Sequence, residues 1–458
     1  MSGEPSIDPA RGLARRLGPF DATMIVMGGV IGAGIFMNPA VVARLVPTRA
    51  LALGAWTLGG LIALGGAFVY AELAARRPQV GGQYAYLRDA YHPFVAFSYA
   101  WALLLVVQTG GMAAVALTFA RYVRALGGDA TAESTLGDTA IAVAALAMLT
   151  LINCLGVRAG STTQNVFMVL KLAALLGLIG AGLLLGRAAP ESAGAAASPL
   201  AGGGGPFATL TDFGAAMVPV LFAYGGWQTG SFVAGELRRP RRDLPIGLLA
   251  GMAGVVAIYL LVNLVCLRVL GLAGLAATPV PASAVMEAVL GPLGGALIAA
   301  GIAVSTLGFL SQSMLTAPRV YYALAEDGLF FRGVAWLHPR TRVPVVAIAL
   351  QGLAAAVIAT SGRYEQILGY VVMVDFLFIT LTFASLFVFR RRDRAAGEPE
   401  PAVRMPGHPV STALLVVAGT LLVGNTIFRY PVHSVIGIGI LLAGLPAYAF
   451  WRRRQTAP

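Results

Sequence analysis

Charged residues are scarce in this chain. Of its 458 residues only 11% are Asp, Glu, Lys or Arg, while 58% are hydrophobic and the mean hydropathy is +0.79. A soluble domain usually has about 25% charged residues, so this chain has too little polar surface to face water on every side. Several apolar stretches reach the roughly 20 residues that a helix needs to cross a bilayer. The composition therefore predicts a polytopic membrane protein.

Cysteine and histidine are also rare. The two cysteines, Cys154 and Cys266, lie inside apolar stretches, and the four histidines are scattered without metal-ligand spacing. These counts argue against a disulfide framework and predict neither a metal site nor a cofactor. An HExxH, GxSxG or paired-acid pattern is missing, which disfavours a membrane enzyme, and so is the repeated filter of a channel. A secondary transporter is the favoured class, with an enzyme or a channel ranked lower.

We expect an all-α protein with twelve transmembrane helices, in which a core at 20–389 is flanked by tails at 1–19 and 452–458 and by two peripheral helices within 410–451. The stretch from Arg187 to Asp212 reads as a flexible surface loop. The N-terminus lacks the apolar segment of a signal peptide, so the first span should be retained. The predicted spans are 20–43, 51–72, 93–120, 138–154, 163–186, 212–234, 245–267, 292–318, 344–361, 365–389, 410–428 and 431–451.

The distribution of arginine predicts the orientation. With the N-terminus inside and loops assigned alternately, 22 arginines fall on the inner side and 8 on the outer side. Inner loops carry such an excess in membrane proteins, so both termini should lie in the cytoplasm and the protein in the inner (plasma) membrane. The net charge of +12 is therefore explained by topology, and we expect membrane lipid but no nucleic acid as a partner.

Two spans contain glycine clusters that predict broken helices. The first span holds Gly28-Gly29-Val30-Ile31-Gly32-Ala33-Gly34 before Pro39, and the sixth holds Pro219 and then Tyr224-Gly225-Gly226. Glycine costs about 1 kcal/mol relative to alanine inside a helix. A break frees N–H groups at a positive helix end for an anion, and carbonyls for an ammonium group. Close helix packing is the alternative reading, but two interrupted spans five apart favour an inverted-repeat transporter.

These motifs resemble the amino acid–polyamine–organocation superfamily, and its L-type amino acid transporter branch in particular. The resemblance rests on Ile31–Phe36 with Pro39, on Phe222–Trp227 with Glu236 and Pro240, and on Gly81-Gly82-x-Tyr84 and Ala325–Gly328. It implies a five-plus-five inverted repeat (a LeuT-like arrangement, with halves at about 20–186 and 212–389), broken helices one and six, and two peripheral helices. It also implies a permease for amino acids that works as an antiporter or a symporter.

The resemblance implies a substrate site at the two breaks. It places the substrate carboxylate on the N–H groups of Ala33, Gly34 and Ile35, and the amine on carbonyls of Val30, Phe222 and Gly225. Phe222 would be the aromatic gate, and Trp227 a packing residue. Ala33 stands where many relatives have serine. No cysteine occurs in 123–138, so we expect no disulfide-linked ancillary subunit. The full set of expected substrate-binding residues is Val30, Gly32, Ala33, Gly34, Ile35, Gln108, Phe222, Ala223, Gly225 and Asp375.

Lys171 is the only lysine of the chain and lies in an otherwise uncharged part of span five. A charge there is costly, and burial disfavours the ammonium form, so a lysine could exchange protons where an arginine could not. The resemblance places it near the first and eighth helices, as a proton-coupling group or a fixed cation. The alternative is a lysine that reaches the membrane surface.

Other polar residues within the spans leave alternatives open. Asp375 in span ten could select the substrate side chain, pair with Lys171 or serve as a structural hydrogen-bonding group. Gln108 and Thr109 face either the pocket or a neighbouring helix. Glu72 and Glu236 are either a cytoplasmic gate or interfacial charges. We expect a neutral amino acid as substrate; cationic amino acids or polyamines are the alternative, and exchange and proton symport stay open.

Overall fold

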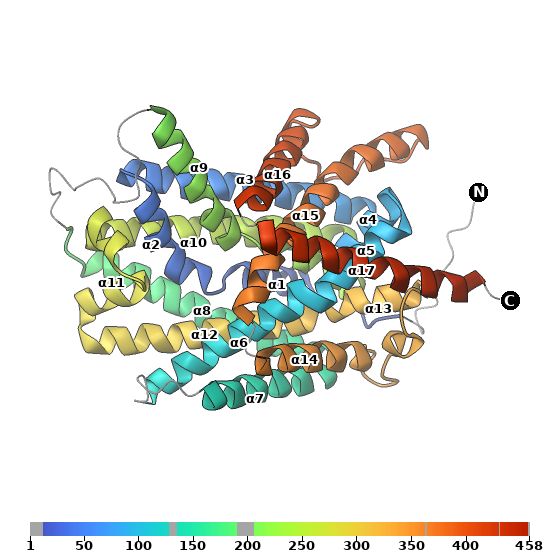
Figure 1. Cartoon of the computed structure of the whole chain (residues 1–458), viewed down its shortest axis with the longest axis horizontal. Coiled ribbons are helices and arrows are strands. Elements are labelled where there is room, and N and C mark those ends of the chain that lie inside the picture. The colour runs from blue at the N-terminus through green and yellow to red at the C-terminus, as the bar shows by residue number, and fades with distance from the viewer. Residues whose placement is uncertain (1–11, 128–134, 190–205, 362–363, 430, 457–458) are drawn as a thin grey trace.

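The computed structural model describes residues 12–127, 135–189, 206–361, 364–429 and 431–456, and this part of the chain is built from helices (Figure 1). The first half contains α1 (Pro19–Val30), α2 (Gly34–Leu45), α3 (Arg49–Arg76), α4 (Gln83–Ala90), α5 (Pro93–Ala102), the π-helix η1 (Leu103–Val107), α6 (Gln108–Leu126), α7 (Thr135–Cys154) and α8 (Val157–Leu184). The second half contains α9 (Pro206–Ala223), the 3-10 helix η2 (Trp227–Glu236), α10 (Pro240–Ala277), α11 (Pro281–Leu290), α12 (Pro292–Thr316), α13 (Pro318–Glu326), η3 (Arg332–Ala335), α14 (Val345–Thr360), α15 (Tyr364–Ala395), α16 (Val410–Arg429) and α17 (Pro431–Thr456).

Each predicted span coincides with a helix or with consecutive helices. Within the described residues, nine helices are long and apolar enough to cross a membrane, and α1 with α2 forms a tenth span bent by 44°. The two remaining predicted spans correspond to α14, which has 16 residues, and to the interrupted pair α9 and η2. The chain is therefore a multi-span membrane protein. The short helices α4, α11 and α13 lie outside the predicted spans or extend them.

Proline marks the start of many of these helices. It occupies one of the first two positions of α1, α5, α10, α11, α12 and α13. The first N–H groups of a helix have no partner within it, so the missing N–H of proline costs nothing there. These prolines therefore fix where the spans begin.

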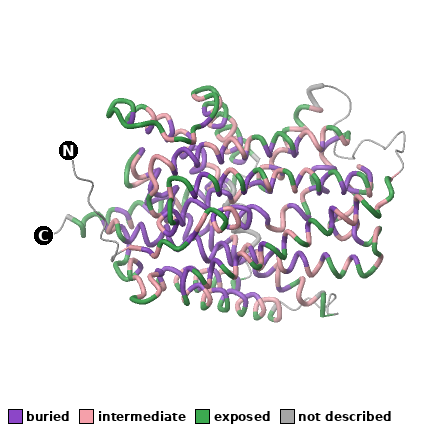
Figure 2. Tube along the Cα trace, turned by 180° about the vertical axis from the view of Figure 1, so that it is seen from behind, coloured by how far each residue is buried: buried purple, intermediate pink, exposed green. Residues whose placement is uncertain are grey.

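The helices surround α1 and the segments on either side of the two breaks. α10 packs along both α3 and α1, and α12 packs along both α8 and α6. Figure 2 shows buried backbone concentrated in the middle of the bundle, while exposed segments cover its outside. Large apolar side chains are exposed on α7, α16 and α17, among them Leu151, Leu421 and Leu442. The bundle thus presents an apolar surface to lipid and keeps its polar groups inside.

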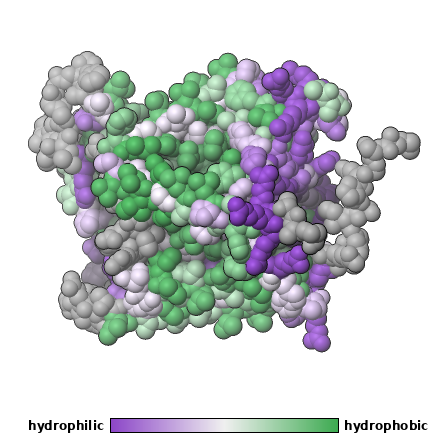
Figure 3. All heavy atoms as spheres, turned by 45° about the vertical axis from the view of Figure 1, so that its right-hand side comes forward, coloured by the Kyte–Doolittle hydropathy of each residue, from purple (hydrophilic) through white to green (hydrophobic). Residues whose placement is uncertain are grey.

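The described chain begins before α1 and ends with α17 at the same end of the bundle, which we call the terminal end (Figure 1). Figure 3 shows hydrophilic residues gathered at this end and an apolar band beside them. The tail before α1 is anchored there, because Leu17 pairs its backbone with Leu237 and is buried. Arg342 also donates to the carbonyl of Gly12. Most of the predicted loop at 187–212 lies outside the described residues.

Candidate functional site

The two predicted helix breaks are present and they touch each other. Residues 31–33 separate α1 from α2, and residues 224–226 separate α9 from η2. Gly226 has a φ of +102°, and a Cβ built on it would lie 2.1 Å from the carbonyl oxygen of Gly29. A Cβ on Gly29 would lie 2.7 Å from the carbonyl oxygen of Gly226. Gly29 and Gly226 therefore fit both interpretations of the glycine clusters, because they permit the helices to break and also to pack closely.

The first break exposes the start of α2. Ala33 precedes this helix and gives its N–H groups no side-chain cap. Phe36 N donates to the Ala33 carbonyl, and within the described residues the N–H groups of Gly34 and Ile35 lack the partner that a capped helix start has. The helix dipole adds a partial positive charge at the same place. Gly32, Ala33 and Gly34 line a cavity, whereas Ile35 is fully buried and does not line it. The uncapped helix start suits a carboxylate.

The carbonyls at the end of α1 are held by two buried side chains. Lys171 Nζ donates to the oxygen of Ile31 at 2.5 Å and to that of Gly28 at 3.3 Å, and Tyr259 Oη donates to Val30 at 3.0 Å. On the other break, Gly225 N donates to the Phe222 carbonyl at 3.1 Å. The predicted amine-binding carbonyls of Val30 and Phe222 thus each have one partner already, and a carbonyl can accept a second hydrogen bond.

Lys171 lies inside the protein and not at a membrane surface. Its side chain is fully buried between α8, α1 and α12, and a Cβ on Gly308 of α12 would lie 2.6 Å from Lys171 Cε. The alternative of a lysine that reaches the interface is therefore wrong. Nor does Lys171 pair with Asp375 among the described residues, since Lys171 Nζ donates to α1 and Asp375 accepts from Gln228. Lys171 does not line the cavity either. It therefore holds the end of α1 from the side that faces away from the cavity.

The cavity between the breaks has a volume of about 270 Å³. Of the ten predicted binding residues, all except Ile35 line it. Phe222 is 50% exposed, so it is not a core residue. Trp227 lines the cavity and also packs on Tyr70, with ring centroids 4.8 Å apart. Residues that line the cavity but were not predicted include Tyr99, Gln228, Thr229, Phe309 and Gln312.

Two glutamines hold the second break in place. Gln228 Oε1 accepts from Gly226 N at 3.0 Å, and its Nε2 donates to Asp375 Oδ2 at 3.2 Å. Gln312 of α12 donates to Thr229 Oγ1 at 2.7 Å, and this hydroxyl donates to the Gly226 carbonyl at 2.6 Å. Neither glutamine was predicted from the sequence as a site residue. Both could have been identified from the sequence, because each is a polar residue inside an apolar span.

Gln108 and Thr109 have different roles. Gln108 lines the cavity, whereas Thr109 does not and donates to the carbonyl of Leu104 at 2.6 Å. Thr109 thus satisfies a carbonyl of the π-helix η1, which the sequence did not reveal. Such π-helical turns occur frequently at functional sites, and this one follows Tyr99 in the cavity wall.

The two glutamates at the terminal end of the bundle each pair with arginine. Glu236 accepts from Arg319 Nε and Nη2 at 2.9 and 2.8 Å, and both side chains are buried. The backbone carbonyl of Glu236 accepts from the N–H groups of Arg16 and Leu17. This pair therefore joins η2, α13 and the N-terminal tail.

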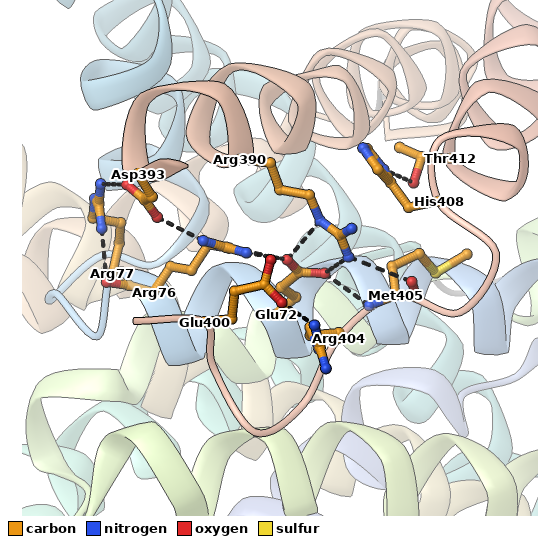
Figure 4. Close-up of polar contacts among 10 residues, drawn as sticks. All are labelled: Glu72, Arg76, Arg77, Arg390, Asp393, Glu400, Arg404, Met405, His408 and Thr412. Atoms are coloured by element: carbon orange, nitrogen blue, oxygen red, sulfur yellow. Dashed lines mark hydrogen bonds and ion pairs between the residues drawn. The ribbon is translucent and has the colours of Figure 1, made fainter. Parts of the chain in front are cut away.

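Glu72 is the centre of a larger network (Figure 4). It accepts from Arg76 on its own helix, from Arg390 of α15 at 2.6 and 2.8 Å, and from the backbone N–H of Met405 at 2.7 Å. Arg76 also donates to Asp393 at 2.7 Å. Glu72 is fully buried, so the reading as an ordinary interfacial charge does not hold. It ties α3 to α15 and to the segment before α16.

Replacing Glu72 with alanine should lower stability sharply, because it leaves Arg390 and a buried N–H without their partner. Removing one member of a buried ion pair costs about 3–5 kcal/mol. Glu400→Ala is the matched control, since both side chains of the Arg404–Glu400 pair are exposed to solvent. Exposed ion pairs contribute about 0–1 kcal/mol to stability. We expect the melting temperature in detergent to fall for Glu72→Ala only. Equal melting temperatures for both variants would show that the network is not stabilising.

Within the described residues, no group of three His, Cys, Asp or Glu side chains could hold a metal ion. The site consists of backbone amides, carbonyls and a few polar side chains in an apolar cavity. Such a site can bind and release a small zwitterion.

Comparison with known proteins agrees with this chemistry. The sequence profile of the family described as amino acid permease matches residues 17–448. The chain belongs to this family. It is thus an amino acid transporter of the amino acid–polyamine–organocation superfamily, and not an enzyme.

Similar proteins cover nearly the whole permease. The serine/threonine exchanger SteT of Bacillus subtilis is 29% identical over 97% of this chain and 99% of its own length. The human b(0,+)-type amino acid transporter 1 is 28% identical, over 95% and 88% respectively. The mouse large neutral amino acids transporter small subunit 2 is 27% identical, over 96% and 82%.

Proposed function

We propose that this permease exchanges small neutral amino acids across the plasma membrane, with the substrate held between the two broken helices. The observation that carries the proposal is the uncapped start of α2, which faces the same cavity as the end of α9. The carboxylate would bind the N–H groups of Ala33 and Gly34, and the amine would bind the remaining acceptor positions on the Val30 and Phe222 carbonyls. A cavity of about 270 Å³ favours a small ligand.

The arrangement of the helices supports an inverted repeat of two five-span halves, followed by α16 and α17. In such a repeat α8 corresponds to α15, and α12 corresponds to α6. The contacts follow this symmetry, because α8 packs on α12 and α15 packs on α6. The interrupted spans, α1 with α2 and α9 with η2, also correspond. Transport would then proceed by rocking of the helices around a fixed site.

The terminal end of the bundle is proposed to face the cytoplasm. The ends of α15 and α17 lie there (Figure 1). They carry Arg390–Arg392 and Arg452–Arg454, and inner loops of membrane proteins have such an excess of arginine. The Glu236–Arg319 and Glu72–Arg390 pairs would then close the cytoplasmic side. We expect no disulfide-linked subunit, because Cys154 and Cys266 belong to α7 and α10.

Exchange is favoured over proton symport by the similarity to an exchanger and by the position of Lys171. Its ammonium group takes the place of a bound cation at the end of α1, because it donates hydrogen bonds to the carbonyls of Gly28 and Ile31. A fixed cation makes a co-transported ion unnecessary. Cationic amino acids are the second candidate substrate, because the carboxylate of Asp375 lines the cavity.

The test is uptake by the purified permease in liposomes. Labelled serine or alanine should enter liposomes that contain unlabelled amino acid several times faster than empty ones, and an imposed pH gradient should not drive accumulation. Accumulation that follows the pH gradient with empty liposomes would establish proton symport. If no amino acid in a panel of neutral and cationic ones enters under either condition, the proposal is wrong.

Phe222→Ala should reduce exchange by about tenfold or more while stability changes little. The ring is half-exposed at the cavity, so its removal leaves little empty core, but a substrate could no longer be covered by it. Phe36→Ala is the comparison, because Phe36 is buried and its loss should cost about 3–5 kcal/mol. If exchange and melting temperature fell together for Phe222→Ala, Phe222 would be a packing residue and not a gate.

A further inference from the structure

One corner of the cavity combines a carboxylate with a free hydroxyl. Asp375 of α15 and Tyr99 of α5 both line the cavity, and the Tyr99 ring packs on Phe378, one turn along α15 from Asp375, with ring centroids 5.3 Å apart. The Tyr99 side chain is 2% exposed, and in the described part of the chain its hydroxyl has no hydrogen-bond partner. Asp375 Oδ2 accepts one hydrogen bond, from Gln228. The corner therefore has unused polar capacity that faces the cavity.

What distinguishes this corner is that its unpaired polar groups face the cavity. The hydroxyl of Tyr70, for example, also has no partner among the described residues but does not line the cavity. A polar group left unpaired costs free energy. Asp375 has no arginine or lysine partner among the described residues. The surrounding cavity wall is apolar, with Leu103, Phe376 and Phe383 among its residues. A ligand that reaches the corner would thus be the missing partner.

We propose that Asp375 and Tyr99 recognise a hydroxyl group on a short substrate side chain, and so select hydroxy amino acids among the neutral ones. This rests on the proposed function, because the carboxylate and amine at the breaks place the side chain in the cavity. The substrate hydroxyl donates to Asp375 and accepts from Tyr99 Oη. Gln228 holds the carboxylate in position, and it also caps the second break through Gly226 N.

A hydroxyl fits this corner better than an ammonium group. An ammonium group on the substrate side chain has three donors and no acceptor. It could not accept a hydrogen bond from Tyr99 Oη, and the corner has no acceptor for its third donor. A hydroxyl has one donor and can also accept, which matches one carboxylate oxygen and one phenol. The small cavity also favours a short side chain over that of lysine or arginine.

The test compares threonine with valine, which has the same shape but lacks the hydroxyl. Competition against labelled alanine is measured in liposomes with wild type, Asp375→Val and Tyr99→Phe. Wild type should prefer threonine over valine by about tenfold or more, because a site built for a hydroxyl rejects an analogue without it. Both variants should bring this ratio close to one. Tyr70→Phe is the matched control, since its buried hydroxyl does not line the cavity and the ratio should stay at the wild-type value.

Three results would overturn the inference. They are a wild-type ratio near one, an unchanged ratio in both variants, and a preference for lysine or ornithine that Asp375→Asn abolishes. The last result would assign Asp375 to a side-chain cation. Because the ratio is measured within one preparation, a poorly folded variant does not mimic the expected result. Failure of wild type to exchange any amino acid would instead overturn the proposed function.

Discussion

Lys171→Ala is expected to lower exchange by at least about tenfold. The variant removes the only side chain that donates to the carbonyls of Gly28 and Ile31 within the described residues. A buried carbonyl left unpaired costs about 1–3 kcal/mol, so the end of α1 should change its conformation and α2 should lose its position relative to the cavity. The measurement is the initial rate of exchange in liposomes, together with the melting temperature.

The variant Lys171→Arg separates the effect of the charge of Lys171 from the effect of its shape. Lys171→Arg keeps the charge, but its planar, larger group meets α12 at Gly308, where a Cβ would already lie 2.6 Å from Lys171 Cε. We expect it to be as slow as Lys171→Ala. Gly177→Ala on the same helix is the control, because a Cβ there meets nothing within 4 Å. Wild-type exchange by Lys171→Ala would show that the first break does not need the lysine.

Gly226→Ala is expected to abolish exchange. Its φ of +102° is strained for any residue with a Cβ, and the new atom would lie 2.1 Å from the Gly29 carbonyl oxygen. Because the contact is backbone to backbone, no side chain can move aside, and the two breaks must separate. Substrate-induced stabilisation should be lost together with exchange.

The control for Gly226→Ala is Gly214→Ala, which lies in α9 and whose Cβ meets nothing within 4 Å. It should insert and exchange as wild type does. Gly34→Ala is informative as a third variant, because its Cβ would meet Ala223 at 3.4 Å, an ordinary contact. It should therefore be milder than Gly226→Ala. Equal exchange by Gly226→Ala and Gly214→Ala would mean that the contact between the breaks is not required.

The spans and both breaks could be predicted from the sequence, because apolar length and glycine clusters are local signals. The packing around the breaks could not. Tyr259 and Gln312 act on residues more than 80 positions away, and neither has a neighbour in sequence that points to this role. The same holds for Tyr99, which is one aromatic residue among many in apolar spans. Lys171 was found because a single charge in an apolar span is conspicuous, but its partners depend on the fold.

The π-helix η1 and the network of Glu72 show a second limit. A π-turn depends on one extra residue in a continuous apolar run, which leaves the composition unchanged. Glu72 was recognised as a charge near a helix end, yet its burial follows from Arg390 and Met405, more than 300 positions later in the chain. Sequence patterns identify such residues and do not reveal their partners.

The most direct test of the site is competition by serine analogues that keep the amine but lack the carboxylate. Serine, its methyl ester and the amine without a carboxylate (ethanolamine) are compared for inhibition of labelled serine exchange in liposomes. If the start of α2 binds the carboxylate through Ala33 and Gly34, serine should compete and the other two should be weaker by about tenfold or more, since hydrogen bonds to a charged group contribute about 1.5–3 kcal/mol. Equal competition by the ester or by ethanolamine would contradict a carboxylate site at the first break.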